Sequence, residues 1–309
     1  MGLSKRSHKI KRFSLKLLIW ARKVSLPGFD DIALYDVGLF FWRSIVKGSI
    51  TTRASAIAFS FFLALPPAII FLFTLIPIIP IDNFQEELFS LIKELVPQSL
   101  FGMIEGTIEQ IIKKPQGGLL SLGFFMALIF STNGFASMMS AFDASLHTFK
   151  RRTWLGQRVI AVMLLFIFSF LLTITIALIT GGQFAIDYMA QKGLLNDDFT
   201  YYLLTFGKWI ITIALFFFAF AFLYYFAPAK KTKWRFISPG GTLATILSIF
   251  TVIGFGYYIS NFSQYNKLYG SIGTLLALLL LFYLMSLILL IGFELNASIN
   301  EAHQQALED

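Results

Sequence analysis

Long apolar stretches without a charged residue dominate the pattern of this chain. Six windows contain no Asp, Glu, Lys or Arg: 54–81, 115–142, 159–186, 209–229, 236–266 and 268–293. About 20 apolar residues in a helix cross the hydrocarbon core of a bilayer, so each window is long enough to span it. The runs are continuous, whereas the strands of a membrane β-barrel alternate between apolar and polar residues. The pattern therefore predicts an all-α, polytopic membrane protein with six transmembrane helices.

The segments outside these windows complete the predicted layout. Residues 1–53 form a basic cytoplasmic or interfacial segment, and residues 298–309 form a cytoplasmic tail. Within 1–53, the stretches 10–24 and 34–48 place apolar residues at helical spacing and predict helices on the inner leaflet. Between the first two spans, residues 82–114 predict short amphipathic helices that cap an outward-facing cavity or rest on the outer leaflet. The transmembrane domain covers 54–297, with spans at about 54–80, 118–142, 159–182, 203–227, 238–262 and 271–293.

Composition and charge fix the expected orientation. Only 14% of the 309 residues are charged and the mean hydropathy is +0.73, whereas soluble domains carry about 25% charged residues. Of the 25 Lys and Arg, 11, 4 and 4 fall in residues 1–53, 150–158 and 230–235, so the positive-inside rule places both termini in the cytoplasm. The net charge of +8 is then a consequence of this topology, and the basic segments are attracted to the anionic lipids of the inner leaflet. We expect membrane lipids as partners and no nucleic acid.

Residues that could carry enzyme chemistry are sparse. His8, His147 and His303 are scattered among the predicted cytoplasmic segments, and the chain has no cysteine. The sequence also lacks the HExxH, Walker A, GxSxG and Rossmann motifs that hold metals, nucleotides or nucleophiles. The sequence therefore predicts no enzyme, no cofactor and no metal site.

Two of the predicted spans contain unusual residues. Pro66 and Pro67 stand near the middle of the first span, where proline removes a hydrogen-bond donor, so we expect the helix to kink or break just before Pro66. Ser60 belongs to a stripe of small residues at every fourth position that favours close helix packing. Asn133 lies near the midpoint of the second span and should face protein or water rather than lipid. Such a kink occurs in transporters, and also as a plain packing feature.

Charged and polar residues lie at three span ends near the predicted inner face: Arg53 opens the first span, Asp143 ends the second, and Glu294 with Asn296 closes the sixth. One interpretation pairs Glu294 with Arg53 or a loop arginine, because a carboxylate at a membrane boundary needs a cationic partner. In the other, Glu294, Asp143 and Asn133 line an inward-opening cavity and contact the polar head of a substrate. Glu294 follows 26 charge-free residues, about 39 Å of helix, which places it at the boundary rather than at the midplane.

Three stretches resemble a known family of proteins. They are AIAFSFFLALPPAIIFLF from residue 56, MMSAFDASLHTFKRRTWLGQR from residue 138, and YYFAPAKKTKWRFISPGGTLAT from residue 224 with its continuation over 265–297. The pattern is similar to that of the YihY/BrkB family of bacterial inner-membrane proteins, also labelled UPF0761, over about residues 35–300. The positions that carry it best are Pro228, Lys233, Pro239, Gly240, Tyr269, Gly270, Gly273, Gly292 and Glu294. The chain departs from the family at Pro66-Pro67, where one proline is usual, and at Phe293, where alanine is usual.

The resemblance implies six transmembrane helices and an inner-membrane location. Older family labels mention a ribonuclease, which the sequence does not support because it has no metal-ligand cluster. We expect a transporter-like or lipid-handling protein without ATPase machinery, whose substrate is a lipid or small solute. The alternative is a membrane scaffold that organises partners or the envelope. A polar cavity reaching Asn133 would favour transport. The sequence leaves the substrate, the direction of transport and the oligomeric state open.

Overall fold

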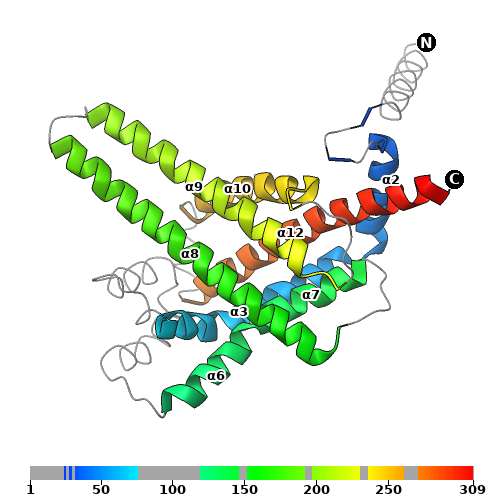
Figure 1. The fold of residues 1–309 in the computed structure, drawn as a ribbon, viewed down its shortest axis with the longest axis horizontal. Coiled ribbons are helices and arrows are strands. Elements are labelled where there is room, and N and C mark those ends of the chain that lie inside the picture. Colours follow the sequence, from blue (N-terminus) through cyan, green and yellow to red (C-terminus); the bar gives the residue numbers. More distant parts are fainter. Residues whose placement is uncertain are drawn as a thin grey trace.

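All regular secondary structure in the described part of the chain is helical. A computed structural model describes residues 24–25, 28–29, 32–75, 119–145, 152–191, 197–229, 236–260 and 271–308, and every regular element in these ranges is an α-helix (Figure 1). They are α2 (Leu34–Lys47), α3 (Ile50–Leu75), α6 (Leu119–Ser131), α7 (Asn133–Ser145), α8 (Trp154–Gln191), α9 (Asp197–Phe226), α10 (Pro239–Ser260) and α12 (Ser271–Glu308). The predicted all-α class is confirmed.

Helix length and composition confirm a polytopic membrane protein. Five helical segments in the described residues are long and apolar enough to cross a bilayer: Phe125–Ser145, Trp154–Leu178, Thr205–Phe226, Pro239–Ile259 and Leu275–Leu307. A sixth is present if Leu34–Val46 and Ile50–Ala68 are counted as one bent span. Residues 1–23 and 76–118, with the predicted N-terminal interfacial helix and outer amphipathic segment, lie outside the described residues.

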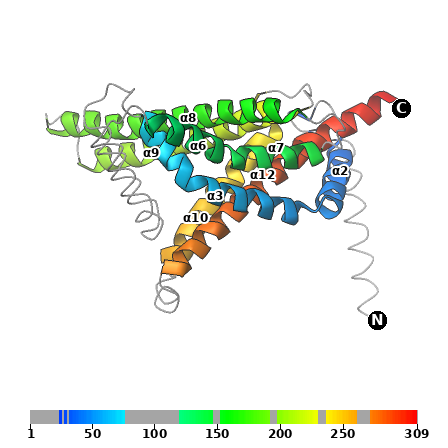
Figure 2. The ribbon, with the colours of Figure 1, turned by 90° about the horizontal axis from the view of Figure 1, so that it is seen from below.

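The transmembrane helices come together at one end and separate toward the other. In α8 the buried residues end at Ser169, and in α9 they begin at Phe220. In α10 they end at Ser248, and in α12 they are nearly continuous only from Ile288. Figure 2 shows α8 and α9 running together, away from α10 and the first half of α12. We call the converging region the joined end, and residues 170–191, 197–219, 249–260 and 271–285 the diverging halves.

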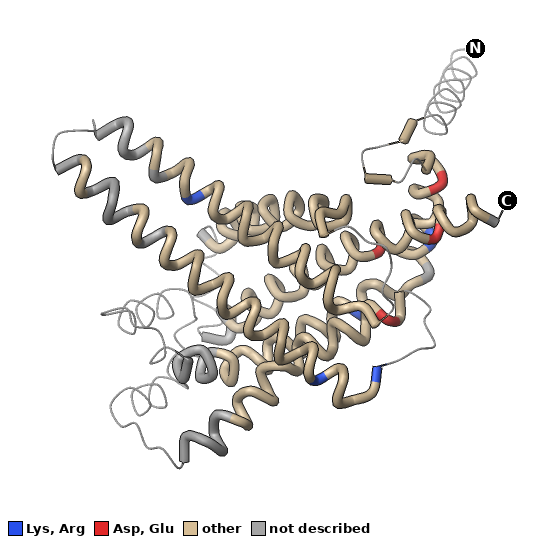
Figure 3. Tube along the Cα trace, viewed as in Figure 1, with Lys and Arg blue, Asp and Glu red and all other residues tan. Residues whose placement is uncertain are grey.

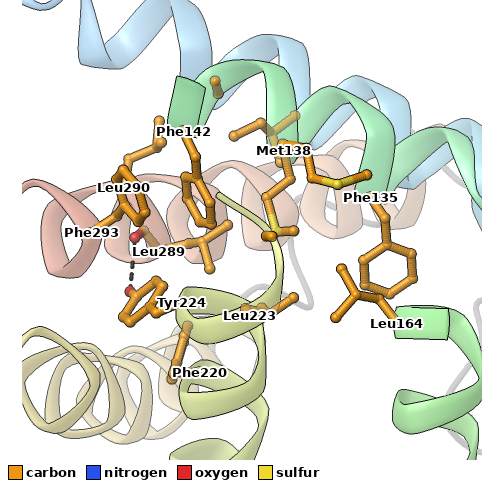
Figure 4. Packing of buried hydrophobic residues seen from close by; sticks show 14 of the residues in the cluster. Phe135, Met138, Phe142, Leu164, Phe220, Leu223, Tyr224, Leu289, Leu290 and Phe293 are labelled. Carbon is orange, nitrogen blue, oxygen red and sulfur yellow. Dashed lines mark hydrogen bonds between the residues drawn. The ribbon is translucent and has the colours of Figure 1, made fainter. Parts of the chain in front are cut away.

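A compact apolar core fills the joined end. The ring of Phe142 from α7 stacks on Phe293 of α12 with centroids 3.9 Å apart, and Tyr224 of α9 meets both rings edge-on at 5.9 Å (Figure 4). The Tyr224 hydroxyl donates to the carbonyl oxygen of Leu289 at 2.8 Å. Because lipid tails are as apolar as these side chains, close packing and interhelical hydrogen bonds hold the helices together more than removal from water does.

Of the predicted kink or break before Pro66, the break is wrong, because α3 continues through both prolines to Leu75. Two adjacent prolines remove only two donors from the helix, and the bonds on either side keep it continuous. The kink stays a prediction. A separate bend of 65° lies between α2 and α3. There Ser49 has a left-handed backbone with φ of 48°, and a Cβ on Gly48 would clash with the carbonyl oxygen of Ser44.

Two further helix limits differ from the simple span pattern. The second span is interrupted at Thr132, which separates α6 from α7. The last helix does not stop near the membrane boundary but continues to Glu308. Its extension is held by α2, because Ile299 and Ala302 pack against Val37 of α2 and against Phe29. The C-terminal segment is therefore helical where it covers α2.

Candidate functional site

A buried ion pair joins α3 to α12. Nη2 of Arg53 in α3 lies 2.6 Å from Oε1 of Glu294 in α12. The same oxygen accepts a hydrogen bond of 2.7 Å from the Ser145 hydroxyl. Nη1 of Arg53 donates to that hydroxyl and to the carbonyl oxygen of Ala141 at 3.0 Å. The Glu294 side chain is 1% exposed, so α3, α7 and α12 meet around a charge removed from water.

Local structure explains why an arginine is stable at this point. Arg53 stands in the first turn of α3, where the helix dipole disfavours a cation, but it faces the last turn of α7, where the dipole favours one. A buried carboxylate left without a partner would be costly, so the guanidinium and the Ser145 hydroxyl together stabilise the charged form of Glu294. Of the two sequence interpretations, the structure contains the pairing of Glu294 with Arg53.

Asn296 connects α12 to the first turn of α10. Its side-chain oxygen accepts the backbone N–H of Gly240 at 2.8 Å, and its amide nitrogen donates to the Ser238 hydroxyl at 2.9 Å. Ser238 in turn accepts the N–H of Gly241 at 3.2 Å. These contacts satisfy two of the N–H groups that the start of a helix leaves without intrahelical partners, and Pro239 at the first position needs none.

Two glycines allow α10 and α12 to touch backbone to backbone. A Cβ added at Gly240 would overlap the carbonyl oxygen of Gly292, and one added at Gly292 would lie 2.5 Å from the carbonyl oxygen of Gly240. The Tyr224 hydroxyl occupies the remaining space beside Gly292. Only glycine fits at either position, and the short separation places Asn296 within reach of the α10 N-terminus.

Arg152 holds the C-terminal end of α9. Its guanidinium donates to the carbonyl oxygens of Phe226, Ala227 and Pro228, at 3.3, 2.9 and 2.7 Å. Carbonyls at a helix C-terminus lack intrahelical donors and carry partial negative charge, so a guanidinium there is favourable. Asp143 of α7 accepts the next backbone N–H, that of Ala229, at 3.0 Å. The turn after α9 is thereby fixed to both α7 and the start of α8.

Arg158 occupies the break between α6 and α7. Its Nη1 donates to the carbonyl oxygen of Ile129 at 3.2 Å, to Oγ1 of Thr132 at 2.7 Å and to Oδ1 of Asn133 at 2.9 Å. The interruption at Thr132 frees the carbonyls at the end of α6, and the guanidinium replaces the missing donors. The side-chain oxygen of Asn133 therefore accepts a hydrogen bond from Arg158 of α8.

The site residues predicted from the sequence do not form one site but take part in separate contacts. Glu294, Asp143 and Asn133 were considered as lining one cavity, but each has its own partner: Arg53, Ala229 and Arg158. Ser60 bonds back to the carbonyl oxygen of Ala56 at 2.8 Å, while Pro66 and Pro67 lie within a continuous α3. The structure thus brings together Arg53 with Glu294, and separately Asn296 with the start of α10.

Sequence reasoning missed Ser145, Arg152, Arg158, Ser238 and Tyr224. A detectable signal existed for the two arginines, since each directly precedes or opens a span and can reach the carbonyl ends of its neighbours. Figure 3 shows that most charged positions of the described helices gather toward the joined end, with one blue position farther along α9, where the sequence has Lys208. Within the ranges that the structure describes, no three His, Asp or Glu side chains form a group that could hold a metal ion.

Comparisons with known proteins agree on one family. The family model described as Virulence factor BrkB matches residues 41–309. A ribonuclease-like protein, YfkH, of Bacillus subtilis is 28% identical over 81% of this chain and 90% of its own length. UPF0761 membrane proteins of Idiomarina loihiensis and Haemophilus influenzae are 27% and 24% identical, over 74% and 89% of this chain and 76% and 98% of their own. No solved structure matches the chain.

Proposed function

The chain belongs to the BrkB family of membrane proteins, and on that premise we propose that it handles lipids, moving them between leaflets along its diverging halves without ATP hydrolysis. One observation carries the proposal. At the joined end the helices are packed together by the apolar core and linked by the buried Arg53–Glu294 pair. Toward the other end the same helices separate (Figure 2). Large apolar side chains are exposed on these separated parts.

The chemistry of the diverging halves suits acyl chains. Exposed side chains there include Phe170, Ile174 and Leu178 of α8, Phe206, Ile210 and Ile213 of α9, Phe250 and Ile253 of α10, and Leu276 and Leu280 of α12. The diverging halves of α10 and α12 contain no Asp, Glu, Lys or Arg. In α10 and α12, a surface of this kind is miscible with hydrocarbon and offers no charged partner to a solute.

Three threonine hydroxyls in the diverging halves bond back to their own helices. The hydroxyls of Thr173, Thr175 and Thr212 donate to carbonyl oxygens four residues earlier, at 2.9, 2.7 and 2.8 Å. A carrier for a hydrophilic solute uses polar groups near the midplane to bind its substrate. This arrangement supports a lipid rather than a small polar solute as the substrate.

The proposal assigns no catalytic step to the chain. The ribonuclease-like name belongs to YfkH, and ribonuclease chemistry through a metal ion would need a cluster of ligands. The positively charged segments place the joined end toward the cytoplasm, so lipid is proposed to reach the diverging halves from the opposite side.

Reconstitution of the full chain into liposomes tests the proposal. A trace of headgroup-fluorescent phospholipid is added, and dithionite is applied outside to bleach every probe that reaches the outer leaflet. We expect protein-free liposomes to lose only their outer-leaflet signal, and liposomes with the protein to lose the inner-leaflet signal as well. Equal loss in both samples would contradict lipid movement and would favour a scaffold.

A matched pair of variants locates the path. Ile253→Asn places an amide in the diverging half of α10, and desolvating it beside an acyl chain costs about 2 kcal/mol, so we expect a severalfold slower inner-leaflet loss. Val46→Asn makes the same change on α2, where the side chain is also exposed but lies outside the diverging halves. Lipid movement in Val46→Asn should equal that of the wild type.

A further inference from the structure

Arg158 is a cation whose protein partners are all neutral. Its three hydrogen bonds go to one carbonyl, one hydroxyl and one amide oxygen, and within the described part of the chain no carboxylate forms an ion pair with it. All three bonds come from Nη1. In that same part of the chain, neither Nε nor Nη2 of Arg158 donates a hydrogen bond to the protein. The N–H groups on these two nitrogens of the charged guanidinium can therefore bind another acceptor.

The surroundings of Arg158 face lipid. Trp154 lies one turn before it on α8, and Cζ of Arg158 stands 5.5 Å from the centre of that ring. Trp154, Leu155 and Val159 are 66%, 69% and 60% exposed, and on α6 Ile129 and Phe130 are exposed as well. Tryptophan prefers the level of the lipid headgroups, so the guanidinium lies where headgroups and the first methylenes of the acyl chains meet.

We infer that Arg158 binds the phosphate of an anionic phospholipid, whose acyl chains lie on the exposed apolar surface of α6 and α8. A cation at the membrane boundary needs a counter-charge, and the abundant anion at that depth is a lipid phosphate. A guanidinium offers paired N–H groups that match phosphate oxygens. The apolar side chains around it favour a lipid over free phosphate. The inference does not depend on lipid movement, because a bound lipid can also serve a scaffold.

The structural role of Arg158 does not account for the whole side chain. Holding the break at Thr132 uses Nη1 alone, and an uncharged amide could supply those hydrogen bonds. Arg152, six residues earlier, differs in this respect because both of its terminal nitrogens bond to backbone carbonyls of the turn after α9. Of these two arginines, only Arg158 leaves Nη2 without a protein partner in the described part of the chain.

Lipid titration of the purified full chain tests the inference. Phosphatidylglycerol or phosphatidylcholine is added to the protein in detergent, and bound lipids are counted by native mass spectrometry. We expect the wild type to prefer phosphatidylglycerol and Arg158→Gln to bind it about tenfold more weakly, as loss of a charge-assisted hydrogen bond predicts. Arg158→Lys should keep most of the preference, and Arg43→Gln, at an exposed arginine of α2, should keep all of it.

Three outcomes would overturn the inference. The first is an unchanged phosphatidylglycerol preference in folded Arg158→Gln. The second is equal binding of the water-soluble headgroup glycerophosphoglycerol, which would assign the site to a free phosphate. The third outcome uses the fluorescence of Trp154 and needs no arginine variant. The Trp154 contribution is the difference between the fluorescence of the wild type and that of Trp154→Phe. Equal quenching of this contribution by brominated phosphatidylglycerol and brominated phosphatidylcholine would contradict the site. Stronger quenching by the anionic lipid supports the site.

Discussion

Glu294→Leu is expected to lower the free energy of unfolding by about 3–5 kcal/mol, because it leaves the guanidinium of Arg53 buried without a counter-charge. The Arg53 side chain is 14% exposed, so water replaces little of what the carboxylate provides. The Ser145 hydroxyl also loses its shorter bond, to Glu294, and keeps only the one of 3.3 Å to the carbonyl oxygen of Ala141. A thermal shift of the purified protein in detergent, followed by size-exclusion chromatography after heating, measures the loss.

Two further variants show whether the pair itself causes the effect. Glu301→Leu removes an exposed carboxylate from the same helix and should change stability by less than about 0.5 kcal/mol. The double variant Arg53→Met with Glu294→Leu should recover most of the loss, because Nε of Arg53 has no partner in the described structure and the pair is incompletely satisfied. A double variant as unstable as Glu294→Leu alone would contradict this explanation.

Gly240→Ala is expected to separate α10 from α12 and to destabilise the protein by about 3 kcal/mol, the upper range for overpacking a rigid contact. The added methyl would overlap the carbonyl oxygen of Gly292 and approach the Asn296 side chain at 2.7 Å. Both obstacles are held by a helix backbone, so neither can move away alone. The bond from Gly240 to Asn296 should be lost with the contact.

Gly254→Ala is the matched control on the same helix. A Cβ at Gly254 meets no atom within 4 Å, so the change should leave stability unchanged or raise it by about 0.5–1 kcal/mol through helix propensity. Melting temperatures in detergent compare the two variants. Equal melting temperatures for Gly240→Ala and Gly254→Ala would show that the close approach of α10 and α12 does not hold the fold together.

Charge-free windows were sufficient to predict most of the fold. They placed the helices that include residues 159–182 and 238–260 because a bilayer requires long apolar helices and excludes most alternatives. Helix ends were less predictable. The sequence turns mostly polar after Phe293, yet α12 continues to Glu308, because Ile299 and Ala302 pack on Val37 in a way that span length does not reveal.

The candidate site was predictable only in part. The need of a boundary carboxylate for a cation predicted that Glu294 pairs with Arg53 or a loop arginine, and only the structure identifies the partner as Arg53. Ser145 could not have been found, because nothing in the sequence places the end of α7 against both residues. The proline pair did not indicate the 65° bend between α2 and α3, which lies where Ser49 adopts a left-handed backbone next to Gly48.

Spin-label distances across the bundle test the central claim that the helices join at one end and diverge at the other. The chain has no native cysteine, so paired labels can be placed without removing any residue. The pair Tyr225→Cys and Ile237→Cys reports the joined end, where the Tyr225 ring lies 6.2 Å from that of Phe236. The pair Phe206→Cys and Ile259→Cys reports the diverging halves of the same two helices, α9 and α10. In lipid nanodiscs we predict a short distance for the first pair and a clearly longer one for the second, whereas equal distances would mean that α9 and α10 stay together and leave no path for a lipid.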